Sequence, residues 1–181
     1  GSGGSIGSEL VRQISDLGPA DLTLVDSSEF NLYSIDMEML RRHPDLPRRA
    51  VITDVRDRHA VQRLFKKVEP QLVFHAAALK HVPAAEYNPF ECIRTNVHGA
   101  ENVVSASIRT DVKRIVALST DKAANPVNLY GASKLAADKI FVAGNNLSSG
   151  RPIYSVVRYG NVAGSRGSVV PFFRKLVAEG A

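Results

Sequence analysis

The chain has 181 residues, of which 44% are hydrophobic and 23% charged, values that are typical of one soluble domain with a sizeable core. Lys and Arg number 23 against 18 Asp and Glu, but they are spread out without interleaved aromatic residues, which favours an acidic small molecule over nucleic acid as the partner. The single cysteine, Cys92, excludes an internal disulfide and a cysteine-based metal cluster, and it indicates a reducing compartment.

Segments with helical spacing of apolar residues alternate with short strand-like segments, which is typical of helices packed around a parallel sheet. Helices are predicted over residues 5–17, 31–43, 61–68, 89–109, 130–145 and 170–178. Strands are predicted over residues 21–26, 50–54, 72–77, 114–119 and 153–158. The strand over 72–77 is nearly all apolar, so we expect it to be buried on both faces. The pattern predicts an α/β fold with a doubly wound parallel sheet in one domain spanning residues 1–181.

Three glycines, Gly1, Gly4 and Gly7, have the spacing G-x-x-G-x-x-G and lead directly into the first predicted helix. Glycine lets the backbone approach a pyrophosphate closely, and the N-terminus of the helix attracts the charge of that group. The pattern therefore predicts a dinucleotide-binding turn of the Rossmann type, although Gly1 alone would also fit a flexible linker. The candidate cofactor-binding residues of this turn are Gly1, Gly4, Ser5, Ile6 and Gly7.

Asp26 ends the strand that follows the first helix. A carboxylate at this position accepts hydrogen bonds from the adenosine ribose of NAD and repels the 2′-phosphate of NADP. No arginine follows it directly, although Ser27 and Ser28 offer hydroxyl groups to a phosphate. The expected cofactor is NAD or NADP, and Asp26 favours NAD.

Two later strands contribute further cofactor-binding candidates at their carboxyl ends. Asp54 and Val55 follow the second predicted strand and are expected to reach the adenine. Ala76, Ala77 and Ala78 end the third predicted strand and are small enough to let the nicotinamide ribose lie close, although plain core packing would also explain them.

A sheet of this type usually begins with an apolar strand that leads into the glycine turn, whereas this chain begins in the turn. We therefore expect the domain to lack its first strand, and to lack a C-terminal substrate lobe after Ala181. No apolar run approaches the roughly 18 residues that cross a bilayer, and no signal peptide is visible, so a cytoplasmic location is expected. A longer parent protein could be anchored on the cytoplasmic side of a membrane. No histidine spacing is typical of a metal site, and no metal is expected.

The segment from Ser119 to Lys134 carries the candidate catalytic residues Thr120, Asp121, Lys122, Tyr130 and Lys134. Tyr130 and Lys134 are one helical turn apart, so they share a face of the predicted helix. An ammonium group beside a phenol lowers the pKa of the tyrosine, and such a tyrosine can accept a proton from a sugar or alcohol hydroxyl.

Four segments, over residues 1–7, 75–83, 119–134 and 158–173, together resemble the extended short-chain dehydrogenase/reductase superfamily. Within it they are similar to the 4,6-dehydratases that act on UDP-N-acetylglucosamine. The second half of the chain resembles the inverting type that opens the pseudaminic acid pathway, while the first half is closer to the polysaccharide-biosynthesis branch, which includes membrane-anchored, non-inverting enzymes. Tyr130 favours the inverting type, because non-inverting members usually carry methionine at this position. Asp26 argues against the inverting type, because the inverting enzymes generally use NADP and Asp26 favours NAD.

The resemblance implies oxidation of the hexose at C4, elimination of water across C5 and C6, and reduction at C6. Tyr130 would remove the C4 hydroxyl proton, Lys134 would hold the cofactor ribose, and Thr120 would hydrogen-bond the C4 oxygen. Lys122 would act as the base at C5 and Asp121 as the acid at C6, which requires a raised pKa for Asp121 and a lowered pKa for Lys122. Lys80, His81, Asn161 and Arg166 are the candidate residues for binding the UDP-sugar.

Two alternatives stay open at this stage. A nucleotide-sugar 4-epimerase shares the fold, the cofactor and the Tyr-Lys pair, but it needs no acid and base for water loss. A non-catalytic NAD(P)-binding module would bind the dinucleotide without turnover. We expect a homo-oligomer for the full-length protein, and little activity for the isolated segment, because its sugar pocket would lack a wall.

Overall fold

Residues 1–148, 150–162 and 178 are the part of the chain that the structure, a computed structural model, describes. The helix predicted over residues 170–178 therefore lies almost wholly outside the described residues. Among the described residues, no helix combines the length and the apolar composition that crossing a membrane requires.

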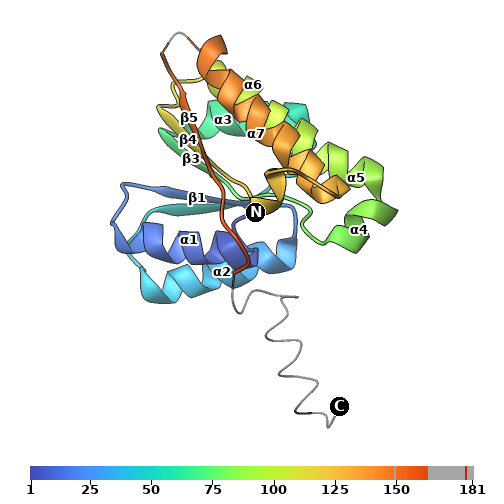
Figure 1. Ribbon diagram of the computed structural model, residues 1–181. Helices are drawn as coiled ribbons and strands as arrows, with labels where there is room; N and C mark the ends of the chain where they lie inside the picture. The colour runs from blue at the N-terminus through green and yellow to red at the C-terminus, as the bar shows by residue number, and fades with distance from the viewer. Residues whose placement is uncertain (149, 163–177, 179–181) are drawn as a thin grey trace.

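Helices and parallel strands alternate along the chain, as the hydrophobic pattern predicts (Figure 1). The strands are β1 (Leu22–Asp26), β2 (Arg48–Ile52), β3 (Leu72–His75), β4 (Arg114–Leu118) and β5 (Ile153–Val157). The α-helices are α1 (Ser5–Asp16), α2 (Glu29–Arg42), α3 (Arg58–Val68), α4 (Val82–Tyr87), α5 (Pro89–Ile93), α6 (Gly99–Ile108) and α7 (Leu129–Leu147). A π-helical turn, η1 (Arg94–His98), joins α5 to α6, and a 3-10 turn, η2 (Asp121–Ala123), follows β4.

The strands form two parallel sheets rather than one continuous hydrogen-bonded sheet, in the orders β1-β2 and β3-β4-β5. The glycine turn lies between the ends of β1 and β3. The Ser2 amide donates to the Val25 carbonyl over 3.0 Å, and a Cβ atom on Gly1 would lie 2.8 Å from the Ala77 nitrogen. The turn thus brings the carboxyl ends of both sheets to one edge. The expectation that the domain lacks its first strand stays a prediction.

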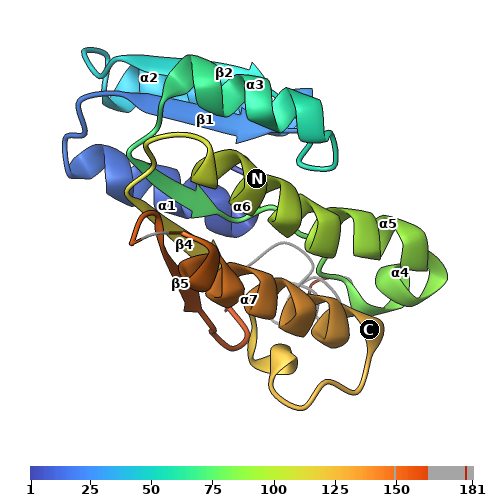
Figure 2. The same cartoon turned by 90° about the horizontal axis from the view of Figure 1, so that it is seen from above.

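Helices cover the sheets from two sides, which confirms the doubly wound α/β fold (Figures 1 and 2). Helices α1 and α2 pack on β1 through a core of Val11, Leu24, Leu32, Ile35 and Met39. On the other side, α3, α6 and α7 pack on β4 and β5 around a larger core. That core contains Val61, Phe65, Ala100, Val103, Val104, Ala106, Val112, Ile115, Ala117, Ala137, Phe141 and Tyr154.

Strand β3, which was predicted to be buried on both faces, is partly exposed on one face. Leu72 is 50% exposed and Phe74 is 37% exposed, while Val73 between them packs against the core. The prediction is wrong for the described residues, because their helices cover β3 only on the side of α3, α6 and α7.

Local interactions shift several predicted boundaries. The Ser28 hydroxyl accepts from the Asn31 amide, so α2 begins before residue 31, and pairing of Leu22 with Arg48 moves β2 to Arg48–Ile52. The helix predicted over 89–109 contains the π-helical turn. Helix α4 was not predicted, because its six residues are too few for a helical period to be recognised.

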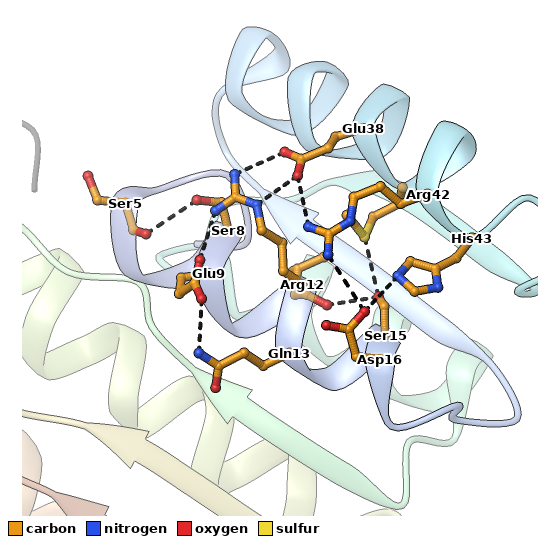
Figure 3. Close-up of polar contacts among 12 residues, drawn as sticks. Ser5, Ser8, Glu9, Arg12, Gln13, Ser15, Asp16, Glu38, Arg42 and His43 are labelled. Atoms are coloured by element: carbon orange, nitrogen blue, oxygen red, sulfur yellow. Dashed lines mark hydrogen bonds and ion pairs between the residues drawn. The ribbon is translucent and has the colours of Figure 1, made fainter.

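Polar contacts join α1 to α2 and so hold the helix that follows the glycine turn (Figure 3). The Arg12 guanidinium binds both carboxylate oxygens of Glu38, at 2.7 Å from Nε and 2.9 Å from a terminal nitrogen. A third contact of 3.0 Å reaches Glu9 on the same helix. The pairing raises the pKa of Arg12 and lowers the pKa of Glu38.

We expect Arg12→Met, which keeps much of the alkyl chain, to lower the free energy of unfolding by about 1 kcal/mol, since it removes a two-point ion pair that solvent partly screens. Urea denaturation would measure the loss. The matched control is Glu9→Gln, which removes one exposed contact to the same guanidinium and should have a smaller effect. Equal losses in the two variants would contradict the importance of the bond between the helices.

Candidate active site

The glycine turn is packed too tightly for side chains at two positions. A Cβ atom on Gly7 would lie 1.8 Å from the Gly1 carbonyl oxygen, and one on Gly3 would lie 2.3 Å from the Asn31 carbonyl oxygen. Gly4 precedes α1, and no side chain caps the first turn of this helix. Glycine at these positions therefore lets the turn fold back on the helix and leaves the helix N-terminus suited to an anion.

Asp26 connects the glycine turn to the loop after β1. Its Oδ2 accepts from the Gly3 amide and its Oδ1 accepts from the Ser28 amide, each over 2.9 Å, and the residue is only 6% exposed. Its carboxylate thus positions the turn. The predicted contact to a ribose stays a prediction, and it would use the remaining lone pairs of these oxygens.

The two residues predicted to bind adenine lie in the turn after β2, where other groups already contact them. The Asp54 carboxylate accepts from the Arg56 guanidinium, which also binds Glu91 and lowers the pKa of Asp54. Val55 packs against Gly99 at the start of α6. An open hollow of about 650 Å³ adjoins Asp54, and Arg94 and His98 line its other side.

The loop after β3, which carries Ala76, Ala77 and Ala78, is held by a residue that sequence reasoning missed. Asn96, in the π-helical turn, is 1% exposed; its Oδ1 accepts from the Leu79 amide, and its Nδ2 donates to the Leu79 carbonyl and to Ser133 Oγ. Ser133 in turn donates to the Tyr130 carbonyl. Asn96 therefore joins the loop to the first turns of α7.

Three predicted catalytic groups and one predicted substrate-binding residue form a continuous hydrogen-bonded chain at the carboxyl ends of β4 and β5. The Thr120 hydroxyl donates to Asp121 Oδ1 over 2.9 Å, and it lies close enough to the Tyr130 phenol to lower the pKa of that phenol. Lys122 Nζ lies 3.2 Å from Asp121 Oδ1 and 3.1 Å from Asn161 Oδ1. The structure therefore brings together the groups that the sequence separates.

The protonation of Asp121 differs from the prediction of a raised pKa. Hydrogen bonds from Thr120 and Lys122 lower the pKa of Asp121, and its exposed carboxylate undergoes little desolvation. The expectation of a raised pKa is wrong for the site without substrate, because both neighbouring donors favour the ionised form.

Tyr130 also differs from the prediction. Burial raises the pKa of Tyr130 most strongly, the bond to Thr120 lowers it, and Tyr159, Asp121 and Asp138 raise it further. The predicted lowering by Lys134 is wrong here, because Lys134 Nζ points to β4 and donates to the Leu118 carbonyl over 2.7 Å. Burial lowers the pKa of Lys134.

The remaining predicted substrate-binding residues are distributed unevenly. Lys80 and His81 are exposed on the loop that follows Leu79, before α4. Arg166 lies outside the described residues.

His75 lies beneath this site at the end of β3. It is 6% exposed, and its ring stacks at a tilt on Phe141 with centroids 5.4 Å apart. Burial first, and then the charge of Lys134, lower the pKa of His75 to about 3. The imidazole is therefore a neutral packing group.

Comparisons with known proteins agree with this geometry. A family model described as polysaccharide biosynthesis protein matches residues 1–181. The chain is 60% identical over 134 residues to the UDP-N-acetylglucosamine 4,6-dehydratase (inverting) of Campylobacter jejuni subsp. jejuni serotype O:2, covering 74% of this chain and 40% of that relative. It is 44% identical over 146 residues to the UDP-glucose 4-epimerase of Rickettsia akari, covering 80% and 42%.

The fold also matches solved structures. The X-ray structure of Pen from Bacillus thuringiensis is similar with a TM-score of 0.88 at 35% identity, covering 99% of this chain and 56% of that chain. The chain thus spans about half the length, or less, of the proteins it matches. These similarities confirm the resemblance that the four sequence segments indicate.

The buried His75 predicts acid sensitivity. Below about pH 6.5 the unfolded chain binds a proton on this imidazole, whereas the folded chain binds it only near pH 3. As the pH falls from about 6.5 to about 3, the free energy of unfolding should therefore decrease by about 1.4 kcal/mol for each pH unit. Denaturation at successive pH values would measure the slope, and His75→Leu should reduce it. Titration of the His75 ring near pH 6.5 by NMR would contradict the prediction.

Proposed function

Because the chain belongs to the polysaccharide biosynthesis protein family, we propose that it forms the catalytic nucleotide-binding part of a nucleotide-sugar 4,6-dehydratase. The observation that carries the proposal is the hydrogen-bonded chain from Thr120 through Asp121 to Lys122, which lies beside Tyr130. Water elimination needs an acid and a base beside the C4 site, whereas oxidation at C4 alone does not need this additional pair. The proposed substrate is UDP-N-acetylglucosamine, on which the Campylobacter relative acts by its name.

The glycine turn fits a nicotinamide dinucleotide. Gly3 and Gly7 have no room for a Cβ atom, and the uncapped start of α1 would face the pyrophosphate. A bound NAD or NADP would supply the hydride acceptor for oxidation at C4 and the hydride donor for reduction at C6. Asp26 would hold the adenosine ribose, while Lys134 would hold the nicotinamide ribose.

Tyr130 and Thr120 would act first. Tyr130, once ionised, would accept the C4 hydroxyl proton, and the Thr120 hydroxyl would donate to the C4 oxygen as it becomes a carbonyl. The raised pKa of Tyr130 means that the site without ligands presents a phenol. Ionisation therefore requires a closer positive charge, which Lys134 would supply by turning from Leu118 toward the cofactor and the phenol.

Asp121 and Lys122 would then remove water. Without substrate they form an ion pair, with Nζ 3.2 Å from Oδ1. Transfer of one proton across this contact makes a neutral amine and a neutral carboxylic acid, and a covering sugar favours the neutral pair by excluding water. Lys122 would take the C5 proton, while Asp121 would protonate the departing C6 hydroxyl. Asn161, bonded to Lys122 at 3.1 Å, would orient the amine or the sugar.

The remaining parts of the proposal concern the whole protein. Lys80, His81 and Arg166 would bind the UDP-sugar, a strand before Gly1 would complete the sheet, and a C-terminal lobe would cover the sugar. The free Cys92 thiol supports a reducing, cytoplasmic location. The exposed Tyr87, 86% accessible, and Phe90, 79% accessible, support a homo-oligomer.

A second candidate is a UDP-sugar 4-epimerase, which the similarity to the Rickettsia enzyme favours. It would use Tyr130 and Lys134 as described above but would leave Asp121 and Lys122 without a chemical role. The two reactions give different products from UDP-N-acetylglucosamine: a 4-keto-6-deoxy sugar, or UDP-N-acetylgalactosamine.

We expect the full-length protein with NAD to convert UDP-N-acetylglucosamine to the 4-keto-6-deoxy sugar. Proton NMR would monitor this conversion and would also report the C5 configuration. Asp121→Asn should slow water loss by about 100-fold or more while sparing C4 oxidation, seen as accumulated reduced cofactor. Asp111→Asn, an exposed carboxylate before β4, is the matched control. Unchanged dehydration in Asp121→Asn would remove the acid role.

Asp26 should set the cofactor preference. Its carboxylate repels a 2′-phosphate, so NAD should bind more tightly than NADP, and Asp26→Ser should reduce the ratio of the two affinities by about tenfold. Both affinities should also fall, because the variant loses the bonds to Gly3 and Ser28. Calorimetric titration measures the ratio, which Asp45→Ser, at an exposed carboxylate before β2, should leave unchanged. An unchanged ratio in Asp26→Ser would contradict the role of the charge.

A further inference from the structure

Helix α7 presents a stripe of ionisable residues that continues past the Tyr-Lys pair. Tyr130, Lys134 and Asp138 follow one another at intervals of one helical turn, so they lie on one face of the helix. At the end of the stripe, Arg158 Nε donates to Asp138 Oδ2 over 2.8 Å from the end of β5. The groups therefore alternate as phenol, ammonium, carboxylate and guanidinium.

Lys134 is in an unfavourable place for a charge. The residue is 5% exposed, and the Leu118 carbonyl is the one hydrogen-bond acceptor that the described residues offer to its ammonium. Burial of an ammonium favours the neutral amine, and burial is the largest influence on the pKa of Lys134, which it lowers. A neutral amine would give no electrostatic help to Tyr130.

Asp138 is the described acidic group that opposes this effect of burial on Lys134. Its side chain is 7% exposed, so water screens its charge little. Arg158, whose side chain is 41% exposed, holds the carboxylate against the start of the loop after β5. The buried Asp138 carboxylate thus forms an ion pair with Arg158 and lies one helical turn from the buried Lys134, with which it forms no direct ion pair while the ammonium donates to Leu118.

Other groups that face Lys134 do not replace Asp138. His75, on β3, is neutral above its pKa of about 3, and on α7 the Tyr130 phenol carries no charge before it ionises. Asp121 lies on η2 and is already bonded to Thr120 and Lys122, while Tyr159, after β5, is a phenol whose pKa burial raises.

We propose that Asp138, held in place by Arg158, is the counter-ion that keeps the buried Lys134 protonated and thereby positions the charge that Tyr130 uses. Arg158 has a double effect in this arrangement: it orients the carboxylate, and it draws part of the negative charge away from Lys134. The proposal rests on the proposed function only for the use that Tyr130 makes of the charge. The protonation of Lys134 is a property of the protein itself.

The test is a pH titration of Lys134 in the full-length protein without cofactor, followed by NMR of lysine labelled with ¹³C at Cε and assigned with Lys134→Met. Asp138→Asn should move the Lys134 midpoint down by about one pH unit or more, because the ammonium loses its counter-charge. Arg158→Gln should move the midpoint up, because the glutamine amide can still donate to the Asp138 carboxylate and orient it, while the competing positive charge is lost. Asp138→Glu should restore the wild-type value in part.

The opposite signs separate this proposal from a purely structural ion pair. If the pair served only to fasten α7 to β5, both variants would lower stability and leave the Lys134 midpoint unchanged. An unchanged midpoint in Asp138→Asn, or shifts of the same sign in Asp138→Asn and Arg158→Gln, would overturn the proposal. If Asp138→Asn does not fold, a downward shift or no shift in Arg158→Gln would overturn it.

Turnover gives an independent second readout. In an active enzyme, the high-pH limb of the kcat/KM profile should move to lower pH in Asp138→Asn and to higher pH in Arg158→Gln. A Lys134 midpoint that shifts as expected in a protein without dehydratase activity would leave the counter-ion role intact and refute the proposed function instead.

Discussion

A hydrogen bond of 2.7 Å from the buried Lys134 ammonium to the Leu118 carbonyl joins helix α7 to the end of β4, and the arrangement of the site depends on it. Tyr130 precedes Lys134 by one turn, and Thr120 follows Leu118 by two residues, so this bond sets the distance between the phenol and the hydroxyl. A cation in this place satisfies a strand-end carbonyl that would otherwise need water. The same cation is then available, with a small side-chain movement, to a bound ribose.

The second requirement of the site is that two sheets end at one edge. No ladder joins β1 to β3 among the described strands, so the glycine turn, through Val25 on one side and Ala76 and Ala77 on the other, makes the connection there. Asp26 holds that turn through Gly3 and holds the start of α2 through Ser28. The residue proposed to select the cofactor is thus also a structural member of the turn proposed to bind it.

The fold class could be predicted, and the candidate catalytic residues could be recognised, because both depend on local sequence patterns. Alternating periodicity predicts the layers, and a tyrosine and a lysine one turn apart indicate a shared helix face. The protonation states could not be predicted, because the pKa of Tyr130 depends on burial and on Asp138 and Tyr159, which other segments or later turns supply. The roles of Asn96 and Arg158 were missed for the same reason, because each acts through contacts with residues far along the chain.

The π-helical turn between α5 and α6 has a consequence for how this helix can vary. A turn of this kind holds one residue more than an α-helical turn. The residues before it are therefore rotated by about 100° around the helix axis, compared with their positions in a regular α-helix. That offset points Asn96 at Leu79 and Ser133, while Val103 and Val104, beyond the turn, face the core. The helix is therefore two functional halves in different rotational phase, one anchoring a loop and one filling the interior. Loss of a single residue between them would bring the halves into phase and turn the anchor away from its loop without removing any core side chain.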